Sequence, residues 1–296
     1  MGVVASHFCA ICVKETDNLD DFLAVEEINN AAMSVLGESP HWCSITQSLF
    51  YIDILACKIH RYIPAINYCE TMQMEQQVGF VIPTNLTTAS NILLIVGLEN
   101  SIVEVNFTEK LILRTVAVVP HASTNHFEKR FNDGKCSFDG SLYAGYMSVK
   151  WREGSRGCFY TLQVSPSPCT LLSVFENEEF HLPNGMAWTS DGKLYIVDSG
   201  ENKIYRYQKY APKDKEGDDS SSGTLLQKVE IYSLSTDDRF NECMLDGMTI
   251  DAEGMLWVAL VAGACLLRID PQTGRELTRL KVPSKKPTSC AFGKLK

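Results

Sequence analysis

Apolar and polar positions alternate over short stretches along most of the chain, and tight turns separate them. The clearest stretch covers residues 130–147, with a polar beginning, a turn at Gly140 and an apolar, aromatic continuation. The same order recurs in residues 184–198 and 246–258, and more loosely in 38–53. A strand, a tight Asp-Gly-like turn and a second strand form the pattern of a β-hairpin. The sequence therefore predicts an all-β protein built from repeated hairpins.

These hairpins belong to units that recur at about 40 to 60 residues, the period of four-stranded propeller blades. A unit without a polar beginning runs through residues 78–107, and Pro287–Gly293 opens a further one. The pattern resumes after the polar stretch 213–223, which is typical of an exposed loop within a blade. We therefore predict one propeller domain over residues 30–296, preceded by a loosely ordered extension over residues 1–29.

Four hairpins begin with an oxygen-bearing side chain at one repeat position: Glu38, Asn132, Asn184 and Asp246. Because the innermost strands of a propeller run in one direction around an axis, these residues are expected to converge. Two carboxylates and two amides suit a hard divalent cation. For any single position the alternative is a residue that only caps an exposed amide. Four at one position favour a metal site.

A cation with an open coordination position polarises a carbonyl group and acidifies water. A neighbouring carboxylate can then accept the proton of the water, and we predict Asp246 as both metal ligand and base. Arg130, beside Asn132, is placed to hold oxygens of a polar substrate. The chain has no phosphate-binding loop, no dinucleotide-binding fingerprint and no serine or cysteine nucleophile motif. The pattern favours hydrolysis of an ester or lactone.

The composition and charge of the chain bear on its partners and its location. A formal net charge of −9, with scattered basic residues, argues against a nucleic-acid partner. The longest uncharged apolar run, residues 255–267, is too short to span a bilayer, so no stable membrane association is expected. Gly2 fits a myristoylation pattern, but one acyl chain binds membranes only marginally. Most of the eleven cysteines lie in strand-like runs, which indicates free thiols and a cytoplasmic location.

Several motifs together resemble one family. They are Leu-Gly-Glu-Ser-Pro-His-Trp from residue 36, Arg-Phe-Asn-Asp-Gly-Lys-Cys from 130, Pro-Asn-Gly-Met-Ala-Trp from 183, Asp-Gly-Met-Thr-Ile-Asp-Ala-Glu-Gly-Met-Leu-Trp-Val from 246 and Pro-Thr-Ser-Cys-Ala-Phe-Gly from 287. This set is similar to the regucalcin (senescence marker protein), gluconolactonase and luciferin-regenerating enzyme family. The resemblance implies a six-bladed propeller with lactonase activity on small-molecule sugar lactones. It also implies one divalent metal (calcium, zinc, magnesium or manganese).

By motif, the resemblance implies Glu38, Asn184 and Asp246 as the metal ligands, with Asp246 also the catalytic base. It implies Arg130 and Asn132 as substrate-binding residues.

The chain departs from the family pattern in three places. Tyr146 stands where members usually have Thr, and Lys150 stands where regucalcin-like members have Glu, so both are candidate substrate-binding positions with altered specificity. The turn in residues 261–265 is apolar. After Gly293 the family continues with about three more strands of a four-stranded blade. We therefore expect a six-bladed β-propeller whose closing blade is truncated at the C-terminus.

Three functions follow as hypotheses. The first is a metal-dependent, gluconolactonase-like hydrolase, its activity impaired by the truncation and the loop changes. The alternative is a calcium-binding regulatory propeller with little or no catalysis. The third, an interaction scaffold of the WD-repeat kind, is disfavoured because the Gly-His and Trp-Asp signatures are absent. The sequence makes no prediction about oligomeric state.

Overall fold

The computed structural model describes residue 28 and residues 30–120, 128–163, 169–175, 179–210, 225–234 and 242–293. Of the predicted extension over residues 1–29, only Ile28 is among the described residues. Gly2 lies outside them. The polar stretch 213–223 also lies outside them.

The described strands form five antiparallel sheets, each made of four strands that are consecutive in the chain. We number these sheets blades 1 to 5. Each blade has an inner strand near the common axis: β1 (Gly37–Cys43), β5 (Phe80–Pro83), β9 (Lys129–Cys136), β13 (Pro183–Trp188) and β17 (Met244–Ile250).

The second and third strands of each blade follow by short connections. The second strands are β2 (Ser48–Asp53), β6 (Leu93–Gly97), β10 (Leu142–Ser148), β14 (Leu194–Asp198) and β18 (Leu256–Val261). The third strands are β3 (Lys58–Ile63), β7 (Ser101–Asn106), β11 (Cys158–Gln163), β15 (Lys203–Tyr210) and β19 (Cys265–Asp270). The outer strands are β4 (Tyr68–Gln73), β8 (Leu111–Val118), β12 (Thr170–Ser173), β16 (Leu225–Ser233) and β20 (Arg275–Lys281).

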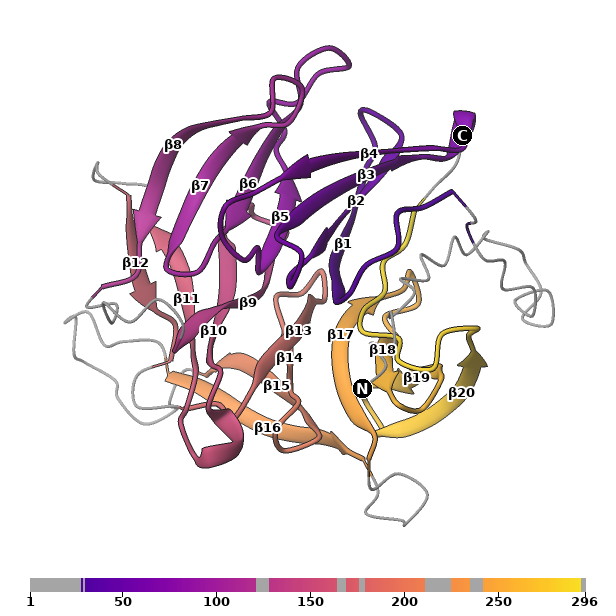
Figure 1. Cartoon of the computed structure of the whole chain (residues 1–296). Coiled ribbons are helices and arrows are strands. Elements are labelled where there is room, and N and C mark those ends of the chain that lie inside the picture. Colours follow the sequence, from indigo (N-terminus) through magenta and orange to yellow (C-terminus); the bar gives the residue numbers. More distant parts are fainter. Residues whose placement is uncertain are drawn as a thin grey trace.

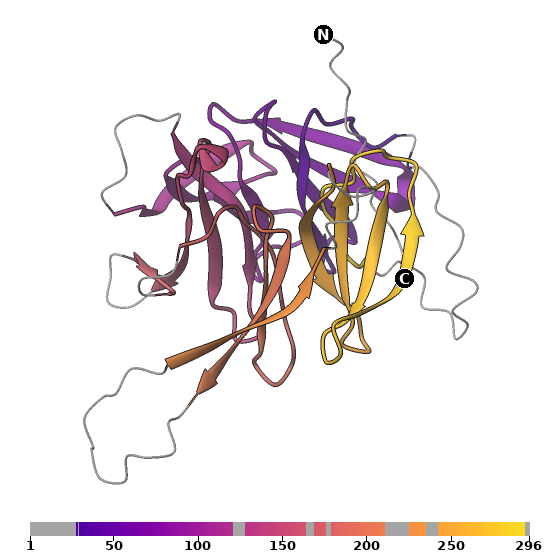
Figure 2. The same ribbon diagram turned by 90° about the horizontal axis from the view of Figure 1, so that it is seen from below.

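Figure 1 shows the blades arranged around an axis, with β13 beside β17 and β5 beside β1. The inner strands β1, β5, β9 and β13 each pack on the inner strand of the next blade along the chain. The hairpin of β15 and β16 extends away from the body, as Figure 2 shows. The prediction of an all-β propeller is confirmed.

The prediction of six blades is wrong, because the described residues form five. The motif Pro287–Gly293 reads as the start of another inner strand, yet residues 282–293 form no strand. This segment leaves β20 and passes between blade 5 and blade 1 (Figure 1, yellow). Its backbone joins no sheet, and Thr288 O accepts a hydrogen bond of 2.8 Å from Gly247 N–H of β17. We call residues 282–293 the terminal segment.

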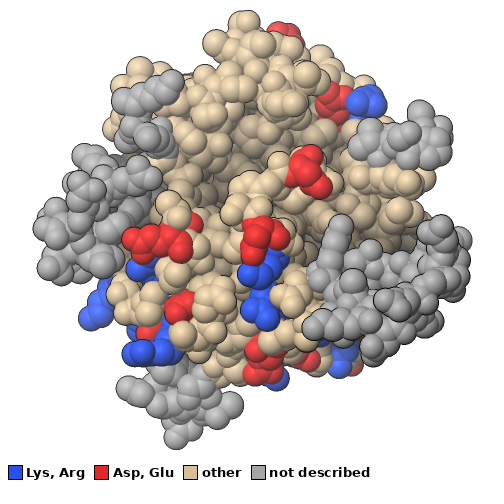
Figure 3. All heavy atoms as spheres, turned by 180° about the vertical axis from the view of Figure 1, so that it is seen from behind, with Lys and Arg blue, Asp and Glu red and all other residues tan. Residues whose placement is uncertain are grey.

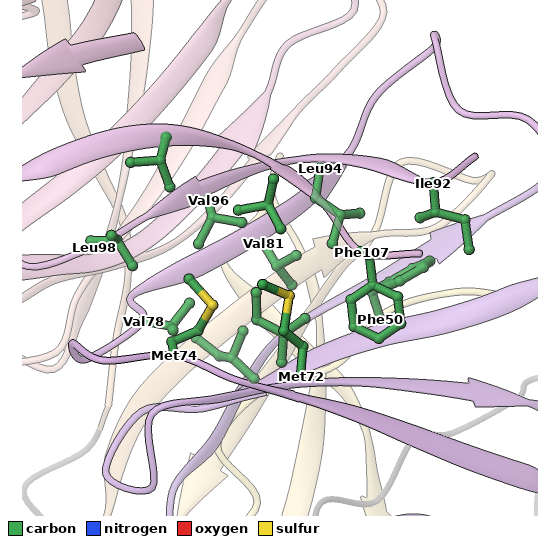
Figure 4. Close-up of a cluster of buried hydrophobic side chains, with 14 of the residues drawn as sticks. Phe50, Met72, Met74, Val78, Val81, Ile92, Leu94, Val96, Leu98 and Phe107 are labelled. Atoms are coloured by element: carbon green, nitrogen blue, oxygen red, sulfur yellow. The ribbon is translucent and has the colours of Figure 1, made fainter. Parts of the chain in front are cut away.

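Apolar side chains of adjacent blades interdigitate between the sheets. The largest such cluster joins blades 1 and 2, and Figure 4 shows side chains of both blades meeting in it. Phe50 of β2 and Phe107, which follows β7, meet edge to face with ring centroids 5.5 Å apart. Both rings are fully buried. Complete burial of an aromatic or large aliphatic side chain stabilises a fold by about 1.5–3 kcal/mol, so the blade faces supply most of the cohesion.

No helix in the described part of the chain is long and apolar enough to cross a membrane. On the face shown in Figure 3, most of the described surface is neither acidic nor basic, and charged side chains of both signs lie interspersed. The thiols of Cys43, Cys243, Cys265 and Cys290 are buried and form no disulfide. The cytoplasmic location stays a prediction.

Two buried aspartates hold the chain where it enters an inner strand. Asp198, at the end of β14, accepts hydrogen bonds from the backbone N–H groups of His181 (2.9 Å), Leu182 (2.9 Å) and Gly200 (3.1 Å). Asp53, at the end of β2, does the same for Val35 (2.7 Å), Leu36 (3.2 Å) and Ala56 (3.1 Å). Leu182 lies two positions before Asn184, and Leu36 lies two positions before Glu38. Each aspartate therefore holds the backbone just ahead of a predicted metal ligand.

We expect Asp198→Ala to lower the free energy of unfolding by about 2–4 kcal/mol, because it leaves backbone donors unsatisfied near the axis. Urea unfolding followed by circular dichroism measures this loss. Asp270→Ala is the matched control, since the Asp270 carboxylate binds Gln272 N–H and the Thr273 hydroxyl in an exposed turn. Equal losses in the two variants would contradict this account of Asp198.

Candidate functional site

The four predicted head residues lie at irregularities of the inner strands. In β13 the pairing with β14 skips from Pro183 to Met186, and in β17 the pairing with β18 skips from Leu245 to Met248. Asn184 and Asp246 therefore each stand in a β-bulge together with a glycine. In β9 the pairing passes from Phe131 to Asp133 and leaves out Asn132.

Blade 1 has its bulge directly after Glu38, between Glu38 and His41. Ser39 in this bulge adopts a positive φ of 51°, which is uncommon for a residue with a side chain. By contrast β5, which carries no polar head residue, pairs with β6 without a break. Bulges bend a strand and re-aim its side chains, so the donors occur where the ladder is interrupted.

Asn184 and Asp246 contact each other although they come from different blades. Asn184 Nδ2 donates hydrogen bonds to Asp246 Oδ1 and to Ser199 Oγ, the latter at 2.9 Å. Both side chains are buried. Gly185 permits this approach, because a Cβ there would lie 2.3 Å from Met248 N and 2.7 Å from Asp246 O. The repeat position thus brings these two residues together.

Glu38 joins them from blade 1. Burial raises the pKa of Glu38 well above its usual value, and repulsion from Asp246 and Asp133 raises it further. Burial likewise raises the pKa of Asp246, although hydrogen bonds from Asn184 and Glu38 partly offset the rise. The two carboxyl groups therefore lie close enough to interact with each other. Without a cation, such a pair holds a shared proton more readily than two negative charges.

Arg130 and Asn132 border the carboxylates on the side of β9. Arg130 Nη1 donates to Asn132 Oδ1 at 2.9 Å and to Phe131 O at 2.8 Å. Asn132 Nδ2 in turn donates to Pro183 O at 3.0 Å, which ties β9 to β13 beside Asn184. Burial lowers the pKa of Arg130 to about 10, while attraction to Glu38 and Asp246 acts in the opposite direction. The guanidinium therefore stays charged at neutral pH.

Three further polar residues near the axis were not predicted as site residues. Lys135 Nζ donates to Met248 O at 3.2 Å, and burial lowers the pKa of the ammonium. Burial raises the pKa of Asp133, which Lys135 partly counteracts. His41 has its pKa lowered to about 4 by burial and then by Lys135. One feature of the sequence indicates two of them: Asp133 and Lys135 are two positions apart after Asn132, so they face the same side of the strand.

Tyr146 and Lys150 lie outside this group of residues. Tyr146 is buried in an apolar cluster, with its ring 5.3 Å from the Phe131 ring, and its hydroxyl donates to Asn100 Oδ1. Lys150 is about half exposed, and its Nζ lies 3.5 Å from Glu128 Oε1. The described contacts of these two side chains do not reach the carboxylates, so their roles in substrate binding stay predictions.

The donor set fits a divalent cation. Glu38 and Asp246 supply two buried carboxylates that repel each other, and Asn184 supplies an amide whose rotation presents its oxygen. Hard divalent cations bind such oxygen ligands. No group of three or more His, Cys, Asp or Glu side chains in the described part of the chain is arranged to hold a metal. A cation here would therefore need the amide oxygen of Asn184 as its third protein donor.

The chain is similar in sequence to known proteins. The family model described as SMP-30/Gluconolactonase/LRE-like region matches residues 36–296. Regucalcin of Danio rerio is 32% identical over 260 residues, which span 87% of this chain and 79% of that protein.

Two solved structures share the fold. A luciferin-regenerating enzyme has a TM-score of 0.71 and 24% identity, with 90% of this chain and 82% of that chain covered. A calcium-binding protein, regucalcin from Agrobacterium tumefaciens strain C58, has a TM-score of 0.69 and 19% identity, covering 88% of this chain and 78% of that one.

The raised carboxyl pKa values predict how the metal-free protein responds to pH. A folded-state pKa above the unfolded value means that folding takes up protons, so stability falls as the pH rises above the ordinary values of 4.5 for Glu38 and 3.8 for Asp246. We expect the melting temperature of chelator-treated protein to fall between about pH 5 and about pH 8. Thermal unfolding followed by circular dichroism measures it.

Asp246→Asn is the comparison, because it removes one of the two repelling charges and should flatten this slope. His41 acts in the opposite sense, since a lowered pKa makes stability rise with pH up to about its ordinary 6.5. His41 is present in both proteins, so the difference between their slopes isolates the carboxyl pair. Identical slopes would contradict the assignment.

Proposed function

Because the chain belongs to the SMP-30/gluconolactonase/LRE-like family, as its motifs predicted, we propose that it hydrolyses a sugar lactone with the help of a divalent cation. One observation of the structure carries the proposal. The buried carboxylates of Glu38 and Asp246 approach each other, and Asn184 donates a hydrogen bond to Asp246. A buried pair of like charges is costly unless a proton or a cation compensates it. Glu38, Asn184 and Asp246 would hold the cation.

The reaction adds water to the lactone carbonyl, breaks the ring C–O bond and releases a hydroxy acid. A divalent cation, when bound, polarises a carbonyl and lowers the pKa of water. Asp246 accepts the proton of the attacking water and can return it to the leaving ring oxygen. Arg130 remains charged and, with Asn132, can orient the oxygens of the sugar by hydrogen bonds.

The test is hydrolysis of D-glucono-δ-lactone by protein that has been chelated and then loaded with calcium, manganese, zinc or magnesium in turn. We expect activity with at least one ion and a loss of about 100-fold or more in kcat for Asp246→Asn. Asp191→Asn is the matched control, because Asp191 lies in an exposed hairpin turn beside Lys193. Full activity of Asp246→Asn, or activity undiminished by chelation, would refute the mechanism.

A second candidate is a calcium-binding regulatory propeller without turnover. Lys150 favours it, since a Lys stands where an acidic substrate contact is expected. The solved regucalcin of the same fold is described as a calcium-binding protein. Calorimetric binding of calcium together with no hydrolysis of any lactone tested would select this function over the first.

A further inference from the structure

Thr288 bonds to the backbone beside each of the two buried carboxylates. Thr288 O accepts a hydrogen bond of 2.8 Å from Gly247 N–H, and Gly247 directly follows Asp246. The Thr288 hydroxyl donates to Gly37 O, and Gly37 directly precedes Glu38. This second bond is buried. One residue of the terminal segment therefore joins the two strands that carry Glu38 and Asp246.

We propose that Thr288 is a positioning residue that sets the separation of Glu38 and Asp246 and so the affinity of the site for a divalent cation. The inference rests on the proposed function, because it concerns the same pair of carboxylates. It adds a residue that touches neither substrate nor cation and acts through Gly37 and Gly247.

The junction between blades 5 and 1 is the place where such a brace is needed. Elsewhere in the ring each inner strand packs on the next, as β13 does on β17 and β1 does on β5. Between β17 and β1 the terminal segment is inserted, so the distance between Asp246 and Glu38 depends on what spans that gap. Both carboxylates repel each other when unprotonated, which works to open the junction.

Close packing keeps Thr288 in register. A Cβ at Gly247 would lie 2.0 Å from Ser289 Oγ and 2.8 Å from Ser289 Cα, so only glycine lets the segment lie this close to β17. On blade 5 the Cys290 thiol donates to Trp257 O at 3.4 Å, and the Phe292 ring meets the Trp257 ring edge to face with centroids 6.4 Å apart. The segment is thus fixed on blade 5.

On blade 1, Gly293 packs against the Trp42 ring, since a Cβ at Gly293 would lie 3.0 Å from it. Apart from this apolar contact, the hydrogen bond from the Thr288 hydroxyl links the segment to β1 immediately next to Glu38. Removing the hydroxyl therefore releases the blade 1 side of the brace and retains the bond from Gly247 N–H.

The experiment compares Thr288→Val, Thr288→Ser and wild type by calorimetric titration of the chelated full chain with Mn²⁺. We expect Thr288→Val to bind Mn²⁺ about 10- to 100-fold more weakly, the usual effect of losing a group that orients a metal ligand. Thr288→Ser keeps the hydroxyl and should restore the affinity. Thr84→Val is the matched control, because the buried Thr84 hydroxyl has no hydrogen-bond partner in the structure. Melting temperatures are recorded for all variants, and titrations are made well below them.

Unchanged Mn²⁺ affinity in Thr288→Val, alongside loss of binding in Asp246→Asn, would overturn this inference and leave the proposed function intact. An equal loss in Thr84→Val, or no restoration in Thr288→Ser, would also overturn it, since the effect would then be a general loss of packing. A wild-type protein that binds no divalent cation would overturn the proposed function and this inference together.

Discussion

The approach of Glu38 to Asp246 is the constraint on which much of the structure near the axis depends. These carboxyl groups come from blades 1 and 5 and are both buried. Burial raises the pKa of each, and repulsion from Asp246 raises the pKa of Glu38 further. Arg130 offsets part of the charge, and Asn184 donates a hydrogen bond to Asp246. A buried pair of this kind is costly to assemble unless a proton or a cation compensates its charge.

The backbone around the pair is adapted to it. Bulges occur at Asn132, Asn184 and Asp246 and directly after Glu38, whereas β5 without a donor is regular. A regular strand directs alternate side chains to opposite faces of its own sheet, so it cannot turn a side chain and its neighbour toward the axis together. Interrupting the ladder allows this, and the buried Asp53 and Asp198 carboxylates fix the chain just before two of the bulges.

The sequence predicted the hairpins and the head residues because both repeat. Four head residues at one repeat position must converge once inner strands run in one direction, and Asn184 and Asp246 do meet. The sequence could not show that Tyr146 packs against Phe131, because that contact depends on the register of β10 against β9. Asp133 was missed since Asp-Gly reads as a turn pair, yet in β9 it continues the strand.

The number of blades was mispredicted for a related reason. Pro287–Gly293 has the residues of an inner-strand head, and a local pattern cannot reveal whether a partner strand lies beside it. In the structure Thr288 of this segment bonds to two blades. Its backbone O accepts a hydrogen bond from Gly247 N–H of blade 5, and its hydroxyl donates to Gly37 O of blade 1. A direct hydrogen-bonded bridge therefore ties the two strands that hold the repelling carboxylates, at the one junction of the ring where the inner strands are separated by the terminal segment.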